Sequence, residues 1–143
     1  MKACVVDASV AVKWVLPSAH ESLVPEAVKL LDRNTLGKTE FLVPDLFWAE
    51  CGNVLWKAVR SGRCSHSVAV GGLATLKAQS LITIASASLV ESAFTTAVAF
   101  NCSVHDSLYV ALAVELGVQL VTADQKFFNT VSGHLPVKWL GAI

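Results

Sequence analysis

The chain has 143 residues, a length that fits one folded domain, and we expect a single domain over residues 1–143. Hydrophobic residues make up 54% and charged residues 15%, which excludes an intrinsically disordered chain and indicates a large core with some surface covered by a partner. The formal charge is zero, with 11 basic and 11 acidic residues, so net charge neither supports nor excludes a nucleic-acid substrate.

The composition also predicts where the protein works. The longest stretches without a charged residue are shorter than the ~18 apolar residues of a membrane-spanning helix. Asp7 and Lys13 interrupt the apolar N-terminal stretch, which argues against a signal peptide. None of the four cysteines forms a CxxC pair, a pattern typical of buried free thiols in a reducing compartment. We therefore expect a cytoplasmic protein that does not associate with membranes.

The first part of the chain predicts a strand followed by two helices. Residues 2–7 (KACVVD) are typical of a short buried strand that ends in Asp7. Residues 9–16 predict a short helix, which the proline at position 17 stops. Residues 22–33 predict an amphipathic helix with Ser22 as its N-cap.

A second strand and two longer helices are expected next. Residues 41–43 predict the strand, and residues 45–61 predict a long helix capped by Asp45. Residues 65–79 predict another helix.

The second half of the chain continues the alternation of strands and helices. The expected elements are a strand at 81–84, a helix at 87–100, a helix at 104–116 capped by Ser103, a strand at 118–122, a short helix from Asp124 and a strand at 137–140. Such alternation predicts an α/β fold, a parallel sheet of about five strands with helices on both faces. In this architecture ligands bind beyond the carboxyl ends of the strands.

Four acidic residues mark the candidate site. Asp7, Asp106 and Asp124 lie beside expected helix starts, where a carboxylate also serves as an ordinary cap, so capping is the alternative for each. Glu50 lies inside the 45–61 helix among apolar residues, and we expect it to be partly buried and to need a cation or a hydrogen-bond donor. Its alternative is exposure, or a salt bridge to Lys57 or Lys13.

Together, the four acids predict a site for a divalent metal ion, which none of them predicts alone. Carboxylate oxygens are the ligands that Mg²⁺ and Mn²⁺ prefer, and Mg²⁺ uses few protein ligands together with water and substrate phosphate. A metal held there activates water and stabilises charge on a phosphodiester. If these acids form one pocket, seven acidic residues remain against 11 basic ones, so the rest of the molecule is basic.

The chain resembles PIN-domain proteins of the VapC toxin type. The resemblance covers nearly the whole chain in the family's order and spacing, and its specificity lies in the ordered set of motifs. It implies a PIN-like fold and a cleft formed by Asp7, Glu50, Asp106 and Asp124. The motifs are VVDASVAVKW, VPDLFWAE, HDSLYVALA and LVTADQKF.

The resemblance also implies an activity and partners. It implies a Mg²⁺-dependent endoribonuclease, with Mn²⁺ as a substitute, that cleaves tRNA or ribosomal RNA. It further implies a homodimer and a small antitoxin that occupies a hydrophobic groove. Ser9 and Thr122 match accessory polar positions that help to hold metal or water. Departures from the family pattern at positions 18–19 and 51–52 remove none of the four acids.

Other residues are weaker candidates for contacts. Lys57 and Arg60, near the end of the 45–61 helix, are candidates for RNA binding, as is Lys13, although basic residues favour helix C-termini anyway. Lys126 is a further cation of this kind. Trp48 and Trp56 share one helix face and are candidates for a partner groove, with simple core packing as the alternative.

Three other functions compete with a toxin nuclease. The first is a PIN-domain nuclease of RNA processing without an antitoxin, and the second is a non-catalytic PIN binding module. The third is a phosphoacceptor or phosphohydrolase domain, which also begins with an Asp at a strand end. The dehalogenase-type form of that third class needs a second Asp two residues later, and this chain has Ser9 there.

Overall fold

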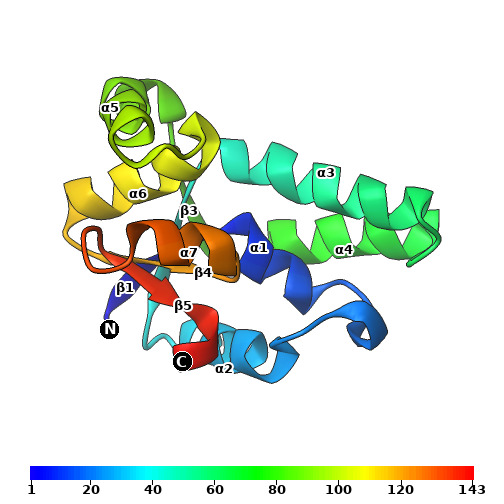
Figure 1. Cartoon of the computed structure of the whole chain (residues 1–143). Helices are drawn as coiled ribbons and strands as arrows, with labels where there is room; N and C mark the ends of the chain where they lie inside the picture. Colours follow the sequence, from blue (N-terminus) through cyan, green and yellow to red (C-terminus); the bar gives the residue numbers. More distant parts are fainter.

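The computed structural model describes residues 1–143 and has a five-stranded sheet in the order β3-β2-β1-β4-β5 (Figure 1). All neighbouring strands are parallel, which confirms the expected fold class. The central strands are almost entirely apolar because helices shield both faces of a parallel sheet. The strands are β1 (Ala3–Val6), β2 (Glu40–Pro44), β3 (Leu81–Ile84), β4 (Gln119–Thr122) and β5 (Val137–Trp139).

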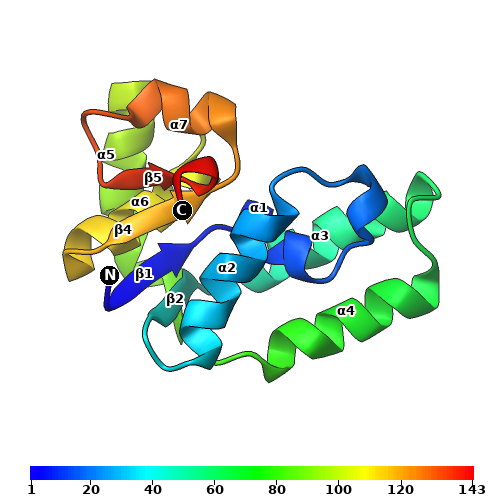
Figure 2. The ribbon, with the colours of Figure 1, turned by 90° about the horizontal axis from the view of Figure 1, so that it is seen from below.

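Helices surround this sheet and also extend beyond it. The helix α6 packs on β1, β2 and β4, and α5 packs on the outside of α6. The helices α3 and α4 lie side by side and project past the sheet (Figures 1 and 2). The helices are α1 (Ala8–Ala11), α2 (Val24–Thr35), α3 (Leu46–Arg60), α4 (His66–Ala78), α5 (Val90–Phe100), α6 (Val104–Leu116) and α7 (Gln125–Val131).

Most expected elements are confirmed, and several begin or end within a residue or two of the expected positions. The 81–84 strand and the 104–116 helix have the predicted bounds. The 9–16 segment is a single α-helical turn that continues as a 3₁₀ turn over Val12–Trp14. The 87–100 helix also begins with a 3₁₀ turn, over Ser86–Leu89.

Two expected caps are wrong. Leu23, not Ser22, directly precedes α2, and it has a left-handed backbone with φ of 58° and no side-chain cap. Asp45 does precede α3, but its carboxylate caps no backbone N–H of the helix. It instead accepts a hydrogen bond from the Ser86 hydroxyl, which is distant in the sequence, at the end of β3.

The helix α6 is buried on nearly all sides between the sheet and α5. Seven consecutive residues, Ser107–Ala113, are buried, which explains why this helix is apolar all round. Asp106 lies immediately before this run, so a firmly packed helix fixes its backbone.

The cysteines are free thiols, as expected. Cys4 and Cys51 are buried, whereas Cys64 and Cys102 are half-buried. Burial raises the pKa of both Cys4 and Cys51 to about 12, so these thiols stay protonated and are poor nucleophiles.

No single helix has the length and apolar character needed to cross a membrane, and the one pair of helices that meets both criteria, Ser86–Phe100 with Val104–Leu116, is bent by 115°.

The serine cap of α6 gives a first prediction. Ser103 Oγ accepts a hydrogen bond from the Asp106 N–H at 3.0 Å, and Ser65 Oγ caps α4 in the same way at Val68. We expect Ser103→Ala to lower the free energy of unfolding by about 1 kcal/mol, measured by urea denaturation. The matched variant Ser65→Ala should cost a similar amount. No loss of stability in Ser103→Ala would contradict the role of this cap.

Candidate active site

A hollow of about 450 Å³ lies beyond the carboxyl ends of β1 and β4, beside α3 and α6. The strands β1 and β4 are paired neighbours, so Asp7, directly after β1, and Asp124, just after β4, emerge at the same edge of the sheet. Glu50 reaches this edge from α3 and Asp106 from the first turn of α6. All four predicted acids line the hollow; its other lining residues are Ala8, Ser9, Leu46, Ala49, Asn53, Val54, Lys57 and His105.

Asp7 is the most constrained of these acids. Its Oδ2 accepts hydrogen bonds from the hydroxyls of Ser9 at 2.8 Å and Thr122 at 2.7 Å. The Ser9 hydroxyl accepts from the Ala123 N–H, and the Thr122 hydroxyl accepts from the Asp124 N–H. Both hydroxyls donate to Oδ2, and the Oδ1 atom carries no hydrogen bond within the protein. The two accessory residues expected from the sequence thus contact the predicted acid directly.

Burial makes Asp7 difficult to ionise. Desolvation raises its pKa from the usual value to about 6, although the hydrogen bonds from Thr122 and Ser9 oppose this rise. The nearby carboxylates of Asp106 and Glu50 raise the pKa further. A positive charge beside Asp7 would reverse this effect, since an opposite charge favours the ionised form of a carboxyl group.

Glu50 has a partner that the sequence analysis did not identify. The phenol of Tyr109 donates a hydrogen bond of 2.6 Å to Glu50 Oε1. Tyr109 is buried in α6, and burial raises its pKa, so the phenol stays protonated and able to donate. Desolvation raises the pKa of Glu50, whereas the Tyr109 hydrogen bond lowers it. The clue in the sequence was spacing, because Tyr109 lies three residues after Asp106, on the same side of one helix.

The expected alternative for Glu50, a salt bridge to a lysine, is wrong. Lys13 Nζ lies 3.2 Å from Glu21 Oε1, and Lys57 forms no salt bridge. Lys57 instead lines the hollow that contains Glu50.

Asp106 and Asp124 are the other two acids that line the hollow. Burial raises the pKa of Asp106, and the carboxylate of Asp124 raises it further. Asp124 is also an N-cap, since its Oδ1 accepts from the Phe127 N–H at 3.0 Å. Asp7 precedes α1, but its side chain caps no N–H there. Capping therefore explains the position of Asp124 and does not explain that of Asp7.

The chemistry of these side chains fits a hard divalent cation. The acids supply only oxygen atoms, and their close negative charges disfavour one another in the absence of a cation. However, no three His, Cys, Asp or Glu side chains gather closely enough to form a ready-made metal-binding group. Mg²⁺ is usually held by one or two carboxylates together with water and substrate phosphate, so it does not require such a group.

The other candidate contact residues lie outside this hollow. Arg60 lies over the ring of Trp56, 4.4 Å from its centroid, and Lys77 lies over Trp48 at 4.5 Å. Trp48 also donates its indole N–H to the Thr83 hydroxyl. Lys57 is therefore the one expected RNA-binding cation that lines the acidic hollow.

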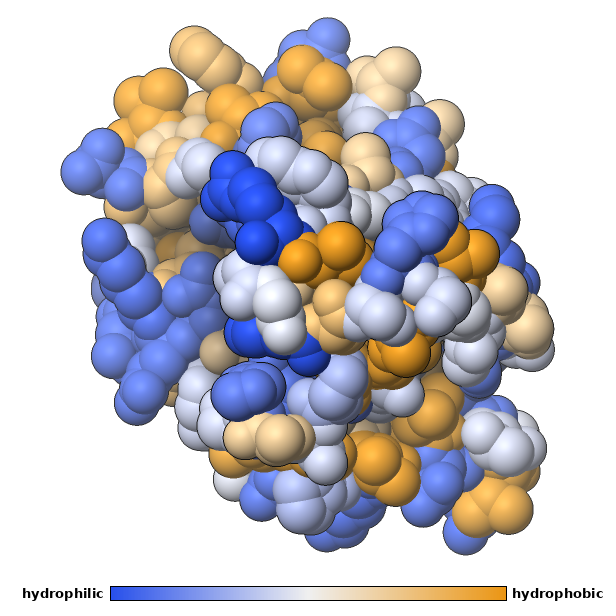
Figure 3. Space-filling model, turned by 90° about the vertical axis from the view of Figure 1, so that its right-hand side faces the viewer, coloured by the Kyte–Doolittle hydropathy of each residue, from blue (hydrophilic) through white to orange (hydrophobic).

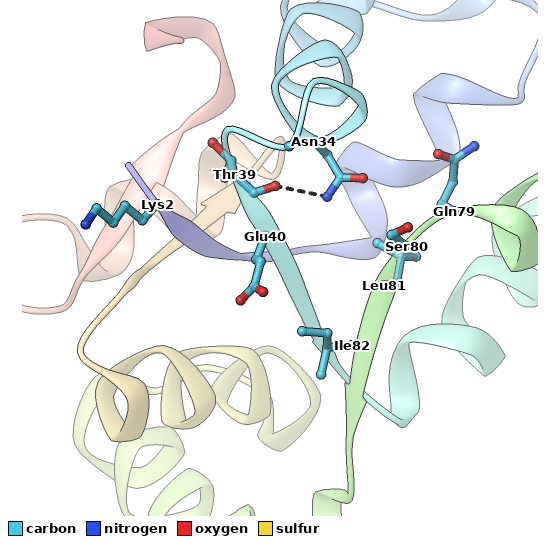
Figure 4. Close-up of a pocket in the computed structure, with 9 residues that line it drawn as sticks. Lys2, Asn34, Thr39, Glu40, Gln79, Ser80, Leu81 and Ile82 are labelled. Atoms are coloured by element: carbon cyan, nitrogen blue, oxygen red, sulfur yellow. Dashed lines mark hydrogen bonds between the residues drawn. The ribbon is translucent and has the colours of Figure 1, made fainter.

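A second hollow, of about 510 Å³, lies at the opposite edge of the sheet, at the start of β2 and β3 (Figure 4). Its lining includes one lysine and one acid, Lys2 and Glu40. The Asn34 amide there donates to the Thr39 carbonyl, a contact within the fold. This hollow has no group of carboxylates and is on the wrong side of the sheet for the predicted site.

Comparison with known sequences identifies the family of the chain. The sequence model of the family described as PIN domain matches residues 4–132. No curated protein sequence matches the chain significantly.

Solved structures share the fold at low sequence identity. A Pyrobaculum aerophilum protein, PAE2754, has a TM-score of 0.70 and 22% identity over 99% of this chain and 85% of that chain. VapC20 of Mycobacterium tuberculosis, described as a sarcin–ricin loop cleaving toxin, has a TM-score of 0.63 and 19% identity over 84% of this chain and 87% of that chain. VapBC2 of Rickettsia felis, bound to a promoter DNA fragment, has a TM-score of 0.62 and 15% identity over 96% and 98% of the two chains.

The raised pKa of Asp7 predicts an unusual pH dependence in metal-free protein. Folded Asp7 holds its proton up to about pH 6, whereas unfolded Asp7 loses it near pH 4. The free energy of unfolding should therefore fall as pH rises between these values, by up to about 3 kcal/mol from this group. We expect urea denaturation in EDTA to show this fall, and Asp7→Asn to reduce it. The exposed control Asp32→Asn should behave like the unmodified protein, and stability that rises with pH over this interval would contradict the prediction.

The contact between Tyr109 and Glu50 predicts a loss of stability on removal of one hydroxyl. Tyr109→Phe keeps the buried ring and deletes the donor, so we expect the free energy of unfolding at neutral pH to fall by about 1–2 kcal/mol. In the Glu50→Gln background, where the charge is gone, the same change should cost less. Equal losses in both backgrounds, measured by urea denaturation, would show that this hydrogen bond is not charge-assisted.

Proposed function

The chain belongs to the PIN domain family, and on this premise we propose that it is a Mg²⁺-dependent endoribonuclease, the toxin of a toxin–antitoxin pair. One observation carries the proposal: four carboxylates from distant parts of the chain line a single hollow at the carboxyl ends of the central strands. Structural likeness to VapC20, itself described as a sarcin–ricin loop cleaving toxin, supports the choice of RNA.

In this proposal Asp7, Glu50, Asp106 and Asp124 hold the divalent cation, some of them through water. A Mg²⁺ or Mn²⁺ ion bound there would supply a more acidic water and an opposing charge for the phosphodiester. Ser9 and Thr122 fix Asp7 so that its Oδ1 stays free of hydrogen bonds within the protein.

In the same proposal Tyr109 orients Glu50, as Ser9 and Thr122 orient Asp7. Its hydrogen bond holds one carboxylate oxygen and favours the ionised form of Glu50. Lys57, which lines the same hollow, is in place to contact a backbone phosphate beside the reacting one.

The proposed toxin also requires protein partners. We propose that a small antitoxin covers the projecting α3–α4 pair, where Trp56 is 53% exposed and Val70 is 51% exposed. Figure 3, which views the molecule toward the ends of these helices, shows separate apolar patches among polar residues. A homodimer is the second proposed contact. Its support is the exposed apolar stripe of Val90, Phe94 and Val98, which recur every four residues along α5.

Substitution of Asp106 tests the proposed activity. We expect purified protein to cut a labelled pool of tRNA and ribosomal RNA at discrete positions with Mg²⁺ or Mn²⁺ and not in EDTA. Asp106→Asn should slow cleavage by more than about 100-fold, the scale of losing one charge-stabilising group, while far-UV circular dichroism stays unchanged. The exposed control Asp32→Asn should cut normally. Full cleavage by Asp106→Asn would contradict the assignment, and folded, partner-free protein that cuts nothing with any metal would favour a binding module.

A further inference from the structure

A third hollow, of about 330 Å³, adjoins the acidic one. The two hollows share Asp106 and Asp124 in their walls, so these carboxylates separate a space on the α3 side from a space on the α7 side. The remaining lining of the α7-side hollow comes from the connection between α5 and α6 and from α7. These residues are Asn101, Cys102, Ser103, Lys126, Phe127 and Thr130.

We propose that the α7-side hollow binds the nucleotide next to the scissile phosphate of single-stranded RNA, an inference that rests on the proposed function. An endonuclease cuts within a chain, so its substrate must leave the acidic site in two directions. The α3-side hollow provides one exit and the α7-side hollow provides the other. Lys126 contacts the phosphate of the bound nucleotide, and the Asn101 amide contacts the edge of its base.

The distribution of charge supports this path. Lys57 lines the α3-side hollow and Lys126 lines the α7-side hollow, with the carboxylates between them. Neither lysine forms a salt bridge, since the ion pairs of this structure join Lys13 and Arg63 to Glu21. One unpaired cation on each side of an acidic site offsets the repulsion between its carboxylates and the phosphates of a passing strand.

The size of the hollow and its polar groups favour one unpaired nucleotide. Its volume is at the lower end of the range for small-molecule sites, and proteins read RNA chiefly through bases that are free of a duplex. Asn101 ends α5 with a left-handed backbone, φ of 52°, and its exposed amide makes no hydrogen bond within the protein. A planar amide offers both a donor and an acceptor to a base edge.

Binding of a short labelled single-stranded RNA in EDTA tests the role of Lys126 without turnover. We expect Lys126→Ala to weaken binding and to reduce the slope of log affinity against log salt by about 0.7, the value for one phosphate contact on a single strand. Lys38→Ala, which removes an exposed lysine at the other edge of the sheet, is the matched control and should keep the original slope. An unchanged slope in Lys126→Ala would overturn the proposal.

Cys102 gives a second and independent readout. Cys102 lines the α7-side hollow, whereas Cys64, which is also half-buried, lies between α3 and α4. The bound RNA should slow alkylation of Cys102 and leave the rate at Cys64 unchanged, as followed by mass spectrometry. Equal rates at Cys102 with and without RNA would count against occupation of this hollow.

Two further results separate this inference from the proposed function. In the first result, RNA protects Cys102 from alkylation and its binding depends on Lys126, but the protein cleaves nothing with any metal. This result would support the binding site and reject the nuclease. Metal-dependent cleavage with no dependence of binding on Lys126 would retain the nuclease and reject the proposed binding site.

Substitution of Asn101 tests the proposed contact with the base. In an active enzyme, Asn101→Gly keeps the left-handed backbone and removes the amide, so we expect it to change the positions of cleavage. An unchanged cleavage pattern would show that the Asn101 amide does not contact the base.

Discussion

The pair of hydroxyl hydrogen bonds to Oδ2 of Asp7 is the contact on which the site depends. Ser9 and Thr122 donate to the same oxygen, and both hydroxyls are held in turn by backbone N–H groups after β4. This network joins the ends of β1 and β4, whose register pairs Val6 with Val121. A slip of one residue would turn Thr122 to the other face of the sheet and remove one of the two hydroxyl donors to buried Asp7. The packing of the central strands therefore fixes the acidic hollow.

The site costs stability in the absence of a cation. Burial and neighbouring carboxylates raise the pKa of Asp7, and burial raises those of Glu50 and Asp106. Paired hydrogen bonds offset only part of this cost, because a hydroxyl donor stabilises the charge of a carboxylate but does not neutralise it. A cation that binds only the folded protein would raise its stability by mass action. Folding and metal binding would then be coupled through the same carboxylates.

The sequence was sufficient for the features that depend on local chemistry. Alternating apolar segments predicted the parallel sheet. The helix α6 has the predicted bounds, between Ser103 and Gly117. The four candidate acids stand out in the sequence because each lies within or beside an apolar segment, and their role in a metal site remains a prediction. The missed features are contacts between segments far apart in the chain, such as Tyr109 with Glu50 and Lys13 with Glu21. No local pattern encodes which partner a half-buried Glu meets across two packed helices. The division into one domain, the metal and the RNA remain predictions.

Tyr109 has one further consequence. It is the only tyrosine of the chain, and its phenol lies 2.6 Å from Glu50. Any spectroscopic signal that is specific to tyrosine therefore comes from a single group in contact with a single carboxylate. Carbon-13 labelling of tyrosine at Cζ would give one resonance, without any mutation or attached dye. The chemical shift of this resonance would therefore report a change in the charge of Glu50 in the native molecule.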